Sequence, residues 1–477
     1  MFFSVRPRRF PQVTRSGFLI AVAFTAIQLT AFAQNDRRIP VKGYITASHL
    51  PAGFDVNDLH VTLRPSTEYG LIGKVESSTQ SPLQNVLQVG VYVEVTGTFD
   101  KRTRATPAEK VYLRDDWDQK LSGLGVIDKV FSNGPEPIVR ADGYRIRITA
   151  TTQVSFASDL KSLDDIAPNM WLHYEGKGDK TGTLVATRIT LLPARPTHFK
   201  AVPGLEINRR DVEPAKDAQT TLPASNTPDP NATADLETKP NDLSTILDKD
   251  GNLTANARIR IGTFGGWHTI PADTALQQRV RRIGASVIPA FQNALPVHHP
   301  SRIPFRFFAV DDNKIRSEIC YLDGLILVPR QVIDRLQNDD QLAAILADGI
   351  AYNLQRQAAR TVEDNRLYLG TQLAADLATL VVPGVGIATI IGSHAVASKI
   401  ATAREQERDR ISLNLLSDAG YDPRQAPEAW RRLASKHSPT EPKYLPYPDR
   451  SGYQLSILNL QFRNTPGAAE SSTSAAQ

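Results

Sequence analysis

The sequence is short of cysteine, with only Cys320 among 477 residues. A single thiol excludes any disulfide within the chain, so the fold has to be held by its hydrophobic core. An excess of one charge is also lacking, since 55 Lys and Arg stand against 50 Asp and Glu. No stretch interleaves aromatic with basic residues. We therefore expect no nucleic-acid partner.

Zinc-binding histidine pairs are missing too, because none of the nine histidines forms an H-x-x-x-H pair. At the N-terminus, arginines precede an apolar run from Phe18 to Phe32, and Ala31-Phe32-Ala33 is a small-x-small cleavage site. This pattern predicts a signal peptide over residues 1–33 and a periplasmic or secreted mature protein. No cysteine follows the cleavage site, so a lipid anchor is not expected.

Residues 38–201 alternate apolar and polar side chains in short runs such as VYVEVTGTFD, which predicts half-buried strands of antiparallel sheets. The region repeats at a spacing of about 80 residues, because VEVTGTFD around Gly97 matches HYEGKGD around Gly176. Each copy, 38–118 and 119–201, has enough strands for an OB-like barrel. The copies resemble β-barrel repeats of unknown function in bacterial exported proteins.

The second half of the chain changes character. Residues 202–256 are rich in Pro, Thr, Asp and Asn and predict a flexible linker, whereas residues 257–463 show helical periodicity, as in the amphipathic stretch from Asp273 to Ile288. Leu377 to Ser398 carries no charge, but its PGVG interruption favours two packed helices over a membrane span. Membrane association is therefore the less favoured alternative. Residues 464–477 are small and polar, and we expect them to be disordered.

The chain is organised around NDDQLAAILADGIAYNLQRQ, from Asn338 to Gln357. Asn338 or Asp339 can cap a helix here, and the acidic first turn suits the positive end of the helix dipole. Apolar residues recur at spacings of three and four, which predicts one buried face. Its members are Leu342, Ile345, Leu346, Ile350 and Leu354.

This frame resembles the active-site helix of the HtpX/BepA-type zinc metallopeptidases. In that family, D-E-L-A-A-V-L-A-H-E-I-A-H supplies two histidine ligands and a glutamate base. Here D-Q-L-A-A-I-L-A-D-G-I-A-Y places Asp348 and Tyr352 at the histidine positions and Gly349 at the base. The resemblance also implies that the strands PFRFFAVDD and GLILVPR form a hairpin, whose second strand presents substrate main chain by strand addition.

A second segment, REQERD followed by A-G-Y-D-P, resembles the family's R-E-x-E-A-D…A-G-Y-D-P. The match implies that Glu405 stands at the third zinc ligand and Asp409 at its supporting carboxylate, with Arg408 in place of the usual alanine. The alternative is a solvated acidic face paired with nearby arginines. His437, in SKHSP, resembles the family's S-T-H-P element.

These residues predict a multidomain chain, all-β in its N-terminal half and α+β, mainly helical, in its metallopeptidase-like half. Gly349 cannot act as a base, and two carboxylates with a phenol are a weak zinc site. We therefore predict no cofactor and a non-catalytic pseudoprotease that binds a peptide or an envelope protein. One alternative is an active zinc endopeptidase of the same family. Another assigns the function to the β repeats, with the helical domain as a docking element.

Overall fold

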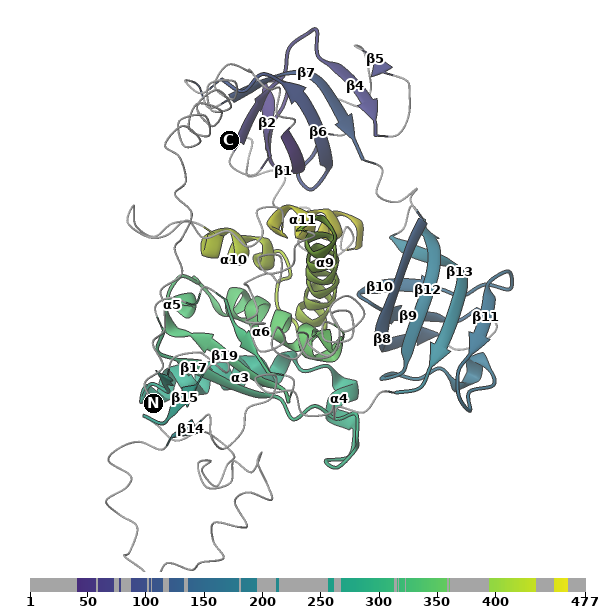
Figure 1. Ribbon diagram of the computed structural model, residues 1–477, viewed down its shortest axis with the longest axis vertical. Coiled ribbons are helices and arrows are strands. Elements are labelled where there is room, and N and C mark those ends of the chain that lie inside the picture. Colours follow the sequence, from purple (N-terminus) through teal and green to yellow (C-terminus); the bar gives the residue numbers. More distant parts are fainter. Residues whose placement is uncertain are drawn as a thin grey trace, which may run out of the picture.

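Two β domains flank a helical domain in the computed structural model, one above it and one to its right in Figure 1. The described residues are 41–56, 59–72, 77–78, 87–100, 103, 105–114, 120–132, 136–179, 182–194, 212–213, 256–260, 267–312, 315, 317–321, 323–357, 360, 394–434 and 450–461. The predicted signal peptide, the predicted disordered C-terminal tail and His437 lie outside these residues. So do residues 377–393 of the uncharged stretch, and residues 394–398 belong to a long helix.

The first β domain is a closed five-stranded barrel. Its strands are β1 (Val41–His49), β2 (Gly53–Val56), β3 (Leu59–Thr62), β6 (Tyr92–Gly97) and β7 (Ala105–Leu113), with β4 (Glu68–Leu71) and β5 (Ser77–Ser78) added outside β7. The order β3-β2-β1-β6-β7 closes because β3 also pairs with β7. Alternation along the strands sends residues such as Phe54 and Val61 into the core and their neighbours outward.

The second β domain repeats this topology. Its strands are β8 (Lys120–Ser132), β9 (Ile138–Ala141), β10 (Tyr144–Arg147), β12 (Trp171–Gly178) and β13 (Thr183–Leu192), with β11 (Gln153–Phe156) outside β13 and the 3-10 turn η2 (Leu163–Asp165) before β12. β10 pairs with β13 and closes the barrel. The prediction of two OB-like barrels is confirmed, and Trp171 of β12 is buried against the helical domain.

The helical domain combines two small sheets with a helical layer. Its strands are β14 (Val212–Glu213), β15 (Arg258–Arg260), β16 (Trp267–Thr269), β17 (Arg306–Val310), β18 (Ile319–Cys320) and β19 (Leu325–Pro329). Its helices are α3 (Thr274–Val287), α4 (Ala290–Ala294), α5 (Arg330–Ile333), α6 (Asp339–Leu354), α9 (His394–Asp418), α10 (Gln425–Ala434) and α11 (Arg450–Gln461). The strand β14 lies within the predicted linker, so part of that segment joins a sheet.

The strands β17 and β19 do not form the expected hairpin. They are parallel, and β19 lies between β17 and β18. The hairpin is β18–β19, which leaves β18 at the sheet edge. The parallel pairing needs a crossover, and the segment that holds β18 supplies it.

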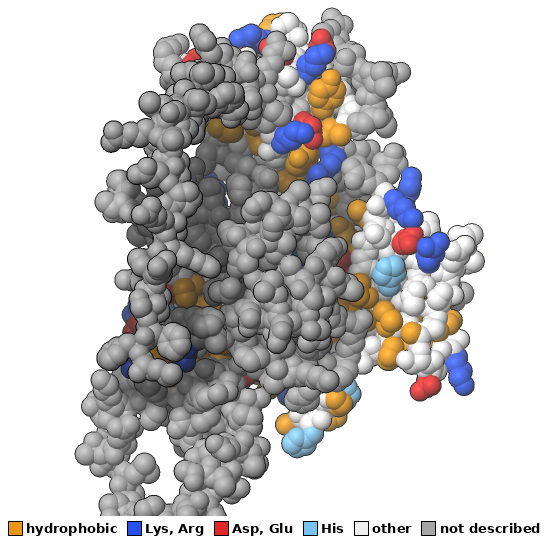
Figure 2. Space-filling view, viewed as in Figure 1, with side chains coloured by type: hydrophobic (Ala, Val, Ile, Leu, Met, Phe, Trp, Pro, Cys, Tyr) orange, Lys and Arg blue, Asp and Glu red, His pale blue; other side chains and the backbone are white. Residues whose placement is uncertain are grey.

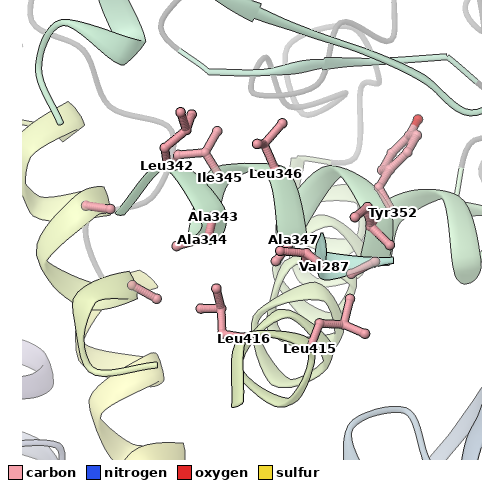
Figure 3. Packing of buried hydrophobic residues seen from close by; sticks show 14 of the residues in the cluster. Val287, Leu342, Ala343, Ala344, Ile345, Leu346, Ala347, Tyr352, Leu415 and Leu416 are labelled. Atoms are coloured by element: carbon pink, nitrogen blue, oxygen red, sulfur yellow. The ribbon is translucent and has the colours of Figure 1, made fainter. Parts of the chain in front are cut away.

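The helix α6 is buried on every side, where one buried face was expected. Asn338 caps it as predicted, and every residue from Gln341 to Leu354 is buried. The small side chains of Ala343, Ala344 and Ala347 let α9 approach closely, while bulkier residues fill the other side (Figure 3). The spacing of three and four residues between the Leu and Ile side chains identified only the bulky side of the helix. The alanine side is also apolar and is buried as well. The helix α6 is therefore the core of this domain.

Both barrels pack onto the helical domain. From the first barrel, Tyr44 stacks edge-on against Tyr453 of α11, with ring centroids 5.9 Å apart. From the second, Asp142 pairs with Arg410 of α9 at 2.5 Å, and Gly143 accepts a hydrogen bond from Asn414. On the visible face of the described barrel surface, charged side chains are scattered between apolar ones (Figure 2). Within the described residues, no helix is both long and apolar enough to cross a membrane.

Candidate functional site

Two helices bring the family-position residues together in the domain core. Asp348 is one turn before Tyr352 on α6, and Glu405 is one turn before Asp409 on α9, so each pair shares a helix face. All four side chains are buried, and Asp348 and Asp409 are fully so. The alternative that Glu405 and Asp409 form a solvated acidic face is therefore wrong.

Arg450 connects the three carboxylates. It begins α11, 41 residues after Asp409 in the chain. Its guanidinium donates to Asp348 Oδ1 and, at 2.7 Å, to Asp409 Oδ1. Its Nε lies 3.6 Å from Glu405 Oε1. The Trp430 ring stacks under the guanidinium carbon at 3.5 Å. One positive group thus contacts all three acidic positions at the centre of the domain.

A second arginine and a fourth acid complete this buried ion cluster, which comprises Glu318, Asp348, Glu405, Arg408, Asp409 and Arg450. The Nε of Arg408 lies 3.4 Å from Asp348 Oδ1, and its guanidinium faces the Tyr352 ring at 5.8 Å. Glu318 immediately precedes β18 and accepts a 2.5 Å hydrogen bond from the Ser317 hydroxyl. Four acids therefore share two guanidinium groups.

Burial shifts the protonation of these acids. The pKa of Glu318 is raised to about 8 by burial, by the negative charge of Asp348 and by a hydrogen bond between Glu318 and Asp348. Burial likewise raises the pKa of Asp409 to about 6 and that of Glu405 well above its ordinary value. The pKa of Asp348 is lowered, because the charges of Arg408 and Arg450 outweigh its burial. The cluster has four acids and only two arginines, and protons held on Glu318 and Glu405 reduce its negative charge.

The structure gives a packing reason for Gly349. A Cβ at this position would lie 3.0 Å from Cys320 Sγ and 3.1 Å from two carbons of Ile326. These distances are tighter than ordinary contacts, so the hairpin β18–β19 approaches the α6 backbone where the family has its catalytic glutamate. A glycine inside a helix costs roughly 1 kcal/mol relative to alanine. The close approach accounts for its presence.

Tyr352 does not supply a metal ligand here. Its ring is buried, and burial raises the pKa of its hydroxyl further above the ordinary value. A neutral phenol is a poor ligand for zinc. Arg408 against the ring adds a cation that repels a metal ion from this side.

The buried ion cluster does not fit zinc. One oxygen on each of Asp348, Glu405 and Asp409 has no hydrogen-bond partner, as a metal ligand could show. However, Arg450 contacts all three groups, so a guanidinium occupies the position between them where a cation would bind. Zinc favours imidazole and thiolate, and in the described part of the cluster neither is present beyond the buried thiol of Cys320. Burial raises the pKa of that thiol well above its ordinary value, so it stays protonated.

The structure brings Asp348, Glu405 and Asp409, which the family resemblance singled out, to one centre. Arg450 and Glu318 were not identified from the sequence. Arg408 stands where the family has alanine, so the sequence already indicated a positive charge near this centre. The local sequence around Arg450 carries no comparable signal, because its role depends on a contact across 102 residues with Asp348.

The fold and this centre define a metallopeptidase-like helical domain joined to two OB-like barrels. The profile of Peptidase family M48 matches residues 275–446, and that of a domain of unknown function, DUF5666, matches 42–107 and 125–190. The helical domain therefore belongs to the HtpX/BepA-type metallopeptidase family, and the two repeats in the N-terminal half are confirmed.

Curated relatives match the chain in part. The beta-barrel assembly-enhancing protease of Yersinia pestis is 28% identical over 191 residues, which cover 37% of each chain. The protein of the same name from Escherichia coli K12 is 26% identical over 155 residues, covering 30% of this chain and 31% of its own. The putative one of Vibrio cholerae is 28% identical over 144 residues, covering 28% and 30%. The chain thus spans about a third of the length of these relatives.

Proposed function

We propose that this chain is an exported cell-envelope protein whose metallopeptidase-like domain binds peptide or protein without cleaving it. The observation that carries the proposal is the contact of Arg450 with all three acidic positions. A guanidinium there supplies the positive charge that a metal would supply, but it has no open coordination position and cannot activate water. Gly349, packed against Cys320 and Ile326, offers no base.

The edge strand β18 supports peptide binding. Among the strands that the structure describes it pairs only with β19, and it lies beside α6. Because the Tyr321 N–H donates to Leu325 in the same hairpin, alternation turns the main chain of Glu318 and Cys320 away from β19. An extended peptide can add to such an edge through main-chain hydrogen bonds.

The leader-like N-terminus and the names of the relatives support an envelope location. An arginine-rich start, an apolar run and a small-x-small site precede Gln34. The relatives are named for the assembly of β-barrels, which suggests that the bound partner is an envelope protein.

The names of the same relatives also favour a second candidate, an active zinc endopeptidase. The chain beginning at Gln34 should be incubated with casein, with and without a chelator, and the products followed by mass spectrometry. We expect intact casein in both samples. Cleavage that the chelator abolishes would show the zinc endopeptidase to be the correct function.

Binding is tested by hydrogen exchange with the same casein. The expected result is slower exchange of amides in residues 317–321 when casein is added, with unchanged exchange in β9 and β10 as the internal reference. Unchanged exchange at 317–321 would contradict binding at this edge.

A restoration experiment tests the arginine contacts. Converting Asp348→His, Gly349→Glu and Tyr352→His should bind no more zinc per chain than the wild type, because Arg450 and Arg408 keep their positive charges in the site. The same three changes together with Arg450→Ala and Arg408→Ala should bind one zinc more per chain than the wild type. An equal gain over the wild type in both variants would show that the arginines do not exclude the metal.

A further inference from the structure

Three side chains on the surface of the first barrel form a second group with metal-binding chemistry, well away from the buried ion cluster. His49 ends β1, Asp55 lies in β2, and His60 lies in β3. Their ligand atoms all lie within 4.8 Å of one another. Among the described residues, no other three His, Cys, Asp or Glu side chains are gathered in this way.

The barrel strands hold these three side chains in place. Asp55 is flanked by Phe54 and Val56, which are buried in the barrel core, so the strand turns the Asp55 side chain outward. Asp55 and His60 are direct cross-strand partners. The Cβ of Gly53, if present, would collide with the Val61 carbonyl, so β2 and β3 are closely packed here. The positions of the ligand atoms therefore depend on regular strand pairing and not on a loose loop.

The carboxylate of Asp55 faces both imidazoles. Its Oδ1 is 2.6 Å from His60 Nδ1, and its Oδ2 is 3.2 Å from His49 Nε2. An aspartate side chain is ionised at neutral pH, as a metal ligand must be.

The spacing suits a small divalent metal. Zinc binds imidazole nitrogen and carboxylate oxygen at about 2.0–2.2 Å, so two ligands of a tetrahedral site lie about 3.3–3.5 Å apart. Small side-chain rotations would bring the three atoms to that separation. The His49 and His60 side chains are 52% and 42% exposed, which allows entry of an ion and leaves a coordination position for water.

The second barrel provides an internal comparison. Its corresponding strands β8, β9 and β10 contain no histidine. Its β9–β10 turn instead packs on α9, where Gly143 contacts Arg410. The repeat that lacks the ligands thus uses this hairpin for docking, while the other repeat exposes it with His49, Asp55 and His60.

We propose that His49, Asp55 and His60 form a surface site for a divalent transition metal, with zinc as the first candidate. Imidazole with one carboxylate suits zinc, copper and nickel, and it disfavours magnesium and calcium. The site is independent of the altered peptidase centre.

Calorimetric titration of the full chain without an affinity tag, using zinc chloride, tests this site. We expect one zinc per chain in the wild type, at least tenfold weaker binding in His60→Ala and in Asp55→Asn, and unchanged binding in His173→Ala. His173 is a matched control because it is an exposed strand histidine of the second barrel. Magnesium chloride should give no heat from this site. Equal affinity in the wild type and His60→Ala, or no stoichiometric zinc in the wild type, would overturn the proposal.

Two further measurements keep the result clear. Cobalt(II) should give the visible absorption of a low-coordinate site in the wild type and lose it in His49→Gln, a change at an exposed side chain that leaves the core intact. A spectrum of hydrated cobalt in both proteins would overturn the proposal.

The variant Glu405→Gln tests whether zinc binds in the buried ion cluster instead, and it should leave zinc binding unchanged. If zinc depends on Glu405 and not on His60, the metal is in the peptidase centre, and both this proposal and the non-catalytic function fail.

Discussion

The buried ion cluster and the His49–Asp55–His60 site present opposite combinations of the same chemistry. In the first, carboxylates at family zinc positions are enclosed by the domain core and contacted by Arg450 and Arg408. In the second, imidazoles and a carboxylate lie on a barrel surface, with half-exposed side chains. The comparison teaches that the capacity of a site to bind metal depends on its ligand types and on its exposure to solvent. It does not follow from the family to which the domain belongs.

The two regions also differ in what they do for stability. Charges in the buried cluster were removed from water, so each depends on its partners, and loss of one partner leaves the others uncompensated. The surface site remains hydrated, so its hydrogen bonds contribute little to the folded state. Loss of one charge from the cluster should therefore destabilise the fold strongly, whereas loss of one side chain from the surface site should change stability little.

The largest expected effect is that of Arg450→Ala, which breaks the buried side of the comparison. Removal of one partner of a buried ion group costs about 3–5 kcal/mol, because Asp348 and Asp409 remain buried without the cation that contacts both. Urea denaturation measures this as a lower midpoint. Arg424→Ala removes a partly exposed ion pair with Asp422 and should change stability by less than about 1 kcal/mol. Similar losses in both variants would show that the Arg450 cluster is not a structural centre.

Gly349→Glu should have the next largest effect. It places a carboxylate against Cys320 and Ile326 and should cost at least about 3 kcal/mol through overpacking and burial of an unpaired acid. The control Gly349→Ala adds only the Cβ, so crowding is offset by better helix propensity and the net cost should be below about 2 kcal/mol. Thermal unfolding of both variants distinguishes the two contributions. A glutamate variant as stable as the wild type would show that the scaffold can still accept a base.

A smaller effect is expected for Glu318→Gln as a function of pH. The pKa of Glu318 is raised to about 8 from an ordinary 4.5, so the folded state holds a proton that the unfolded state has released. This contribution is fully present below pH 4.5 and is lost as pH rises through about 8. The variant stays neutral, so its stability should fall less than that of the wild type over this range. Parallel stability curves for the two proteins would show that Glu318 is not held protonated.

Most of the fold could be predicted from local sequence. Alternation and the internal repeat predicted two barrels, and the capping residue with its periodic apolar side chains predicted α6. The complete burial of α6 could not be predicted, because alanines that admit α9 look like neutral helix residues in the sequence. The parallel pairing of β17 and β19 was also missed, since strand direction depends on a crossover and not on the strand residues.

The candidate centre was predicted only as far as the family motifs reached. Asp348 and Glu405 occupy the expected positions, yet what they do is decided by Arg450 and Glu318, which lie far away in the chain. The surface site was missed for a similar reason. His49 and His60 are eleven residues apart without a recognised ligand spacing, and only the register of β1, β2 and β3 brings them onto Asp55.

The smallest expected effect is that of His60→Ala without metal, and it sharpens the comparison from the surface side. The side chain is 42% exposed and its partner Asp55 remains hydrated, so stability should change by less than about 1 kcal/mol. With zinc present at 100 times its dissociation constant, the wild type should gain about 2.7 kcal/mol and the variant almost none. Urea denaturation with and without zinc measures both values, with His173→Ala as the control that keeps the gain. A large loss without metal would mean that the His49–Asp55–His60 contacts are structural like those of Arg450, and the contrast between the two regions would disappear.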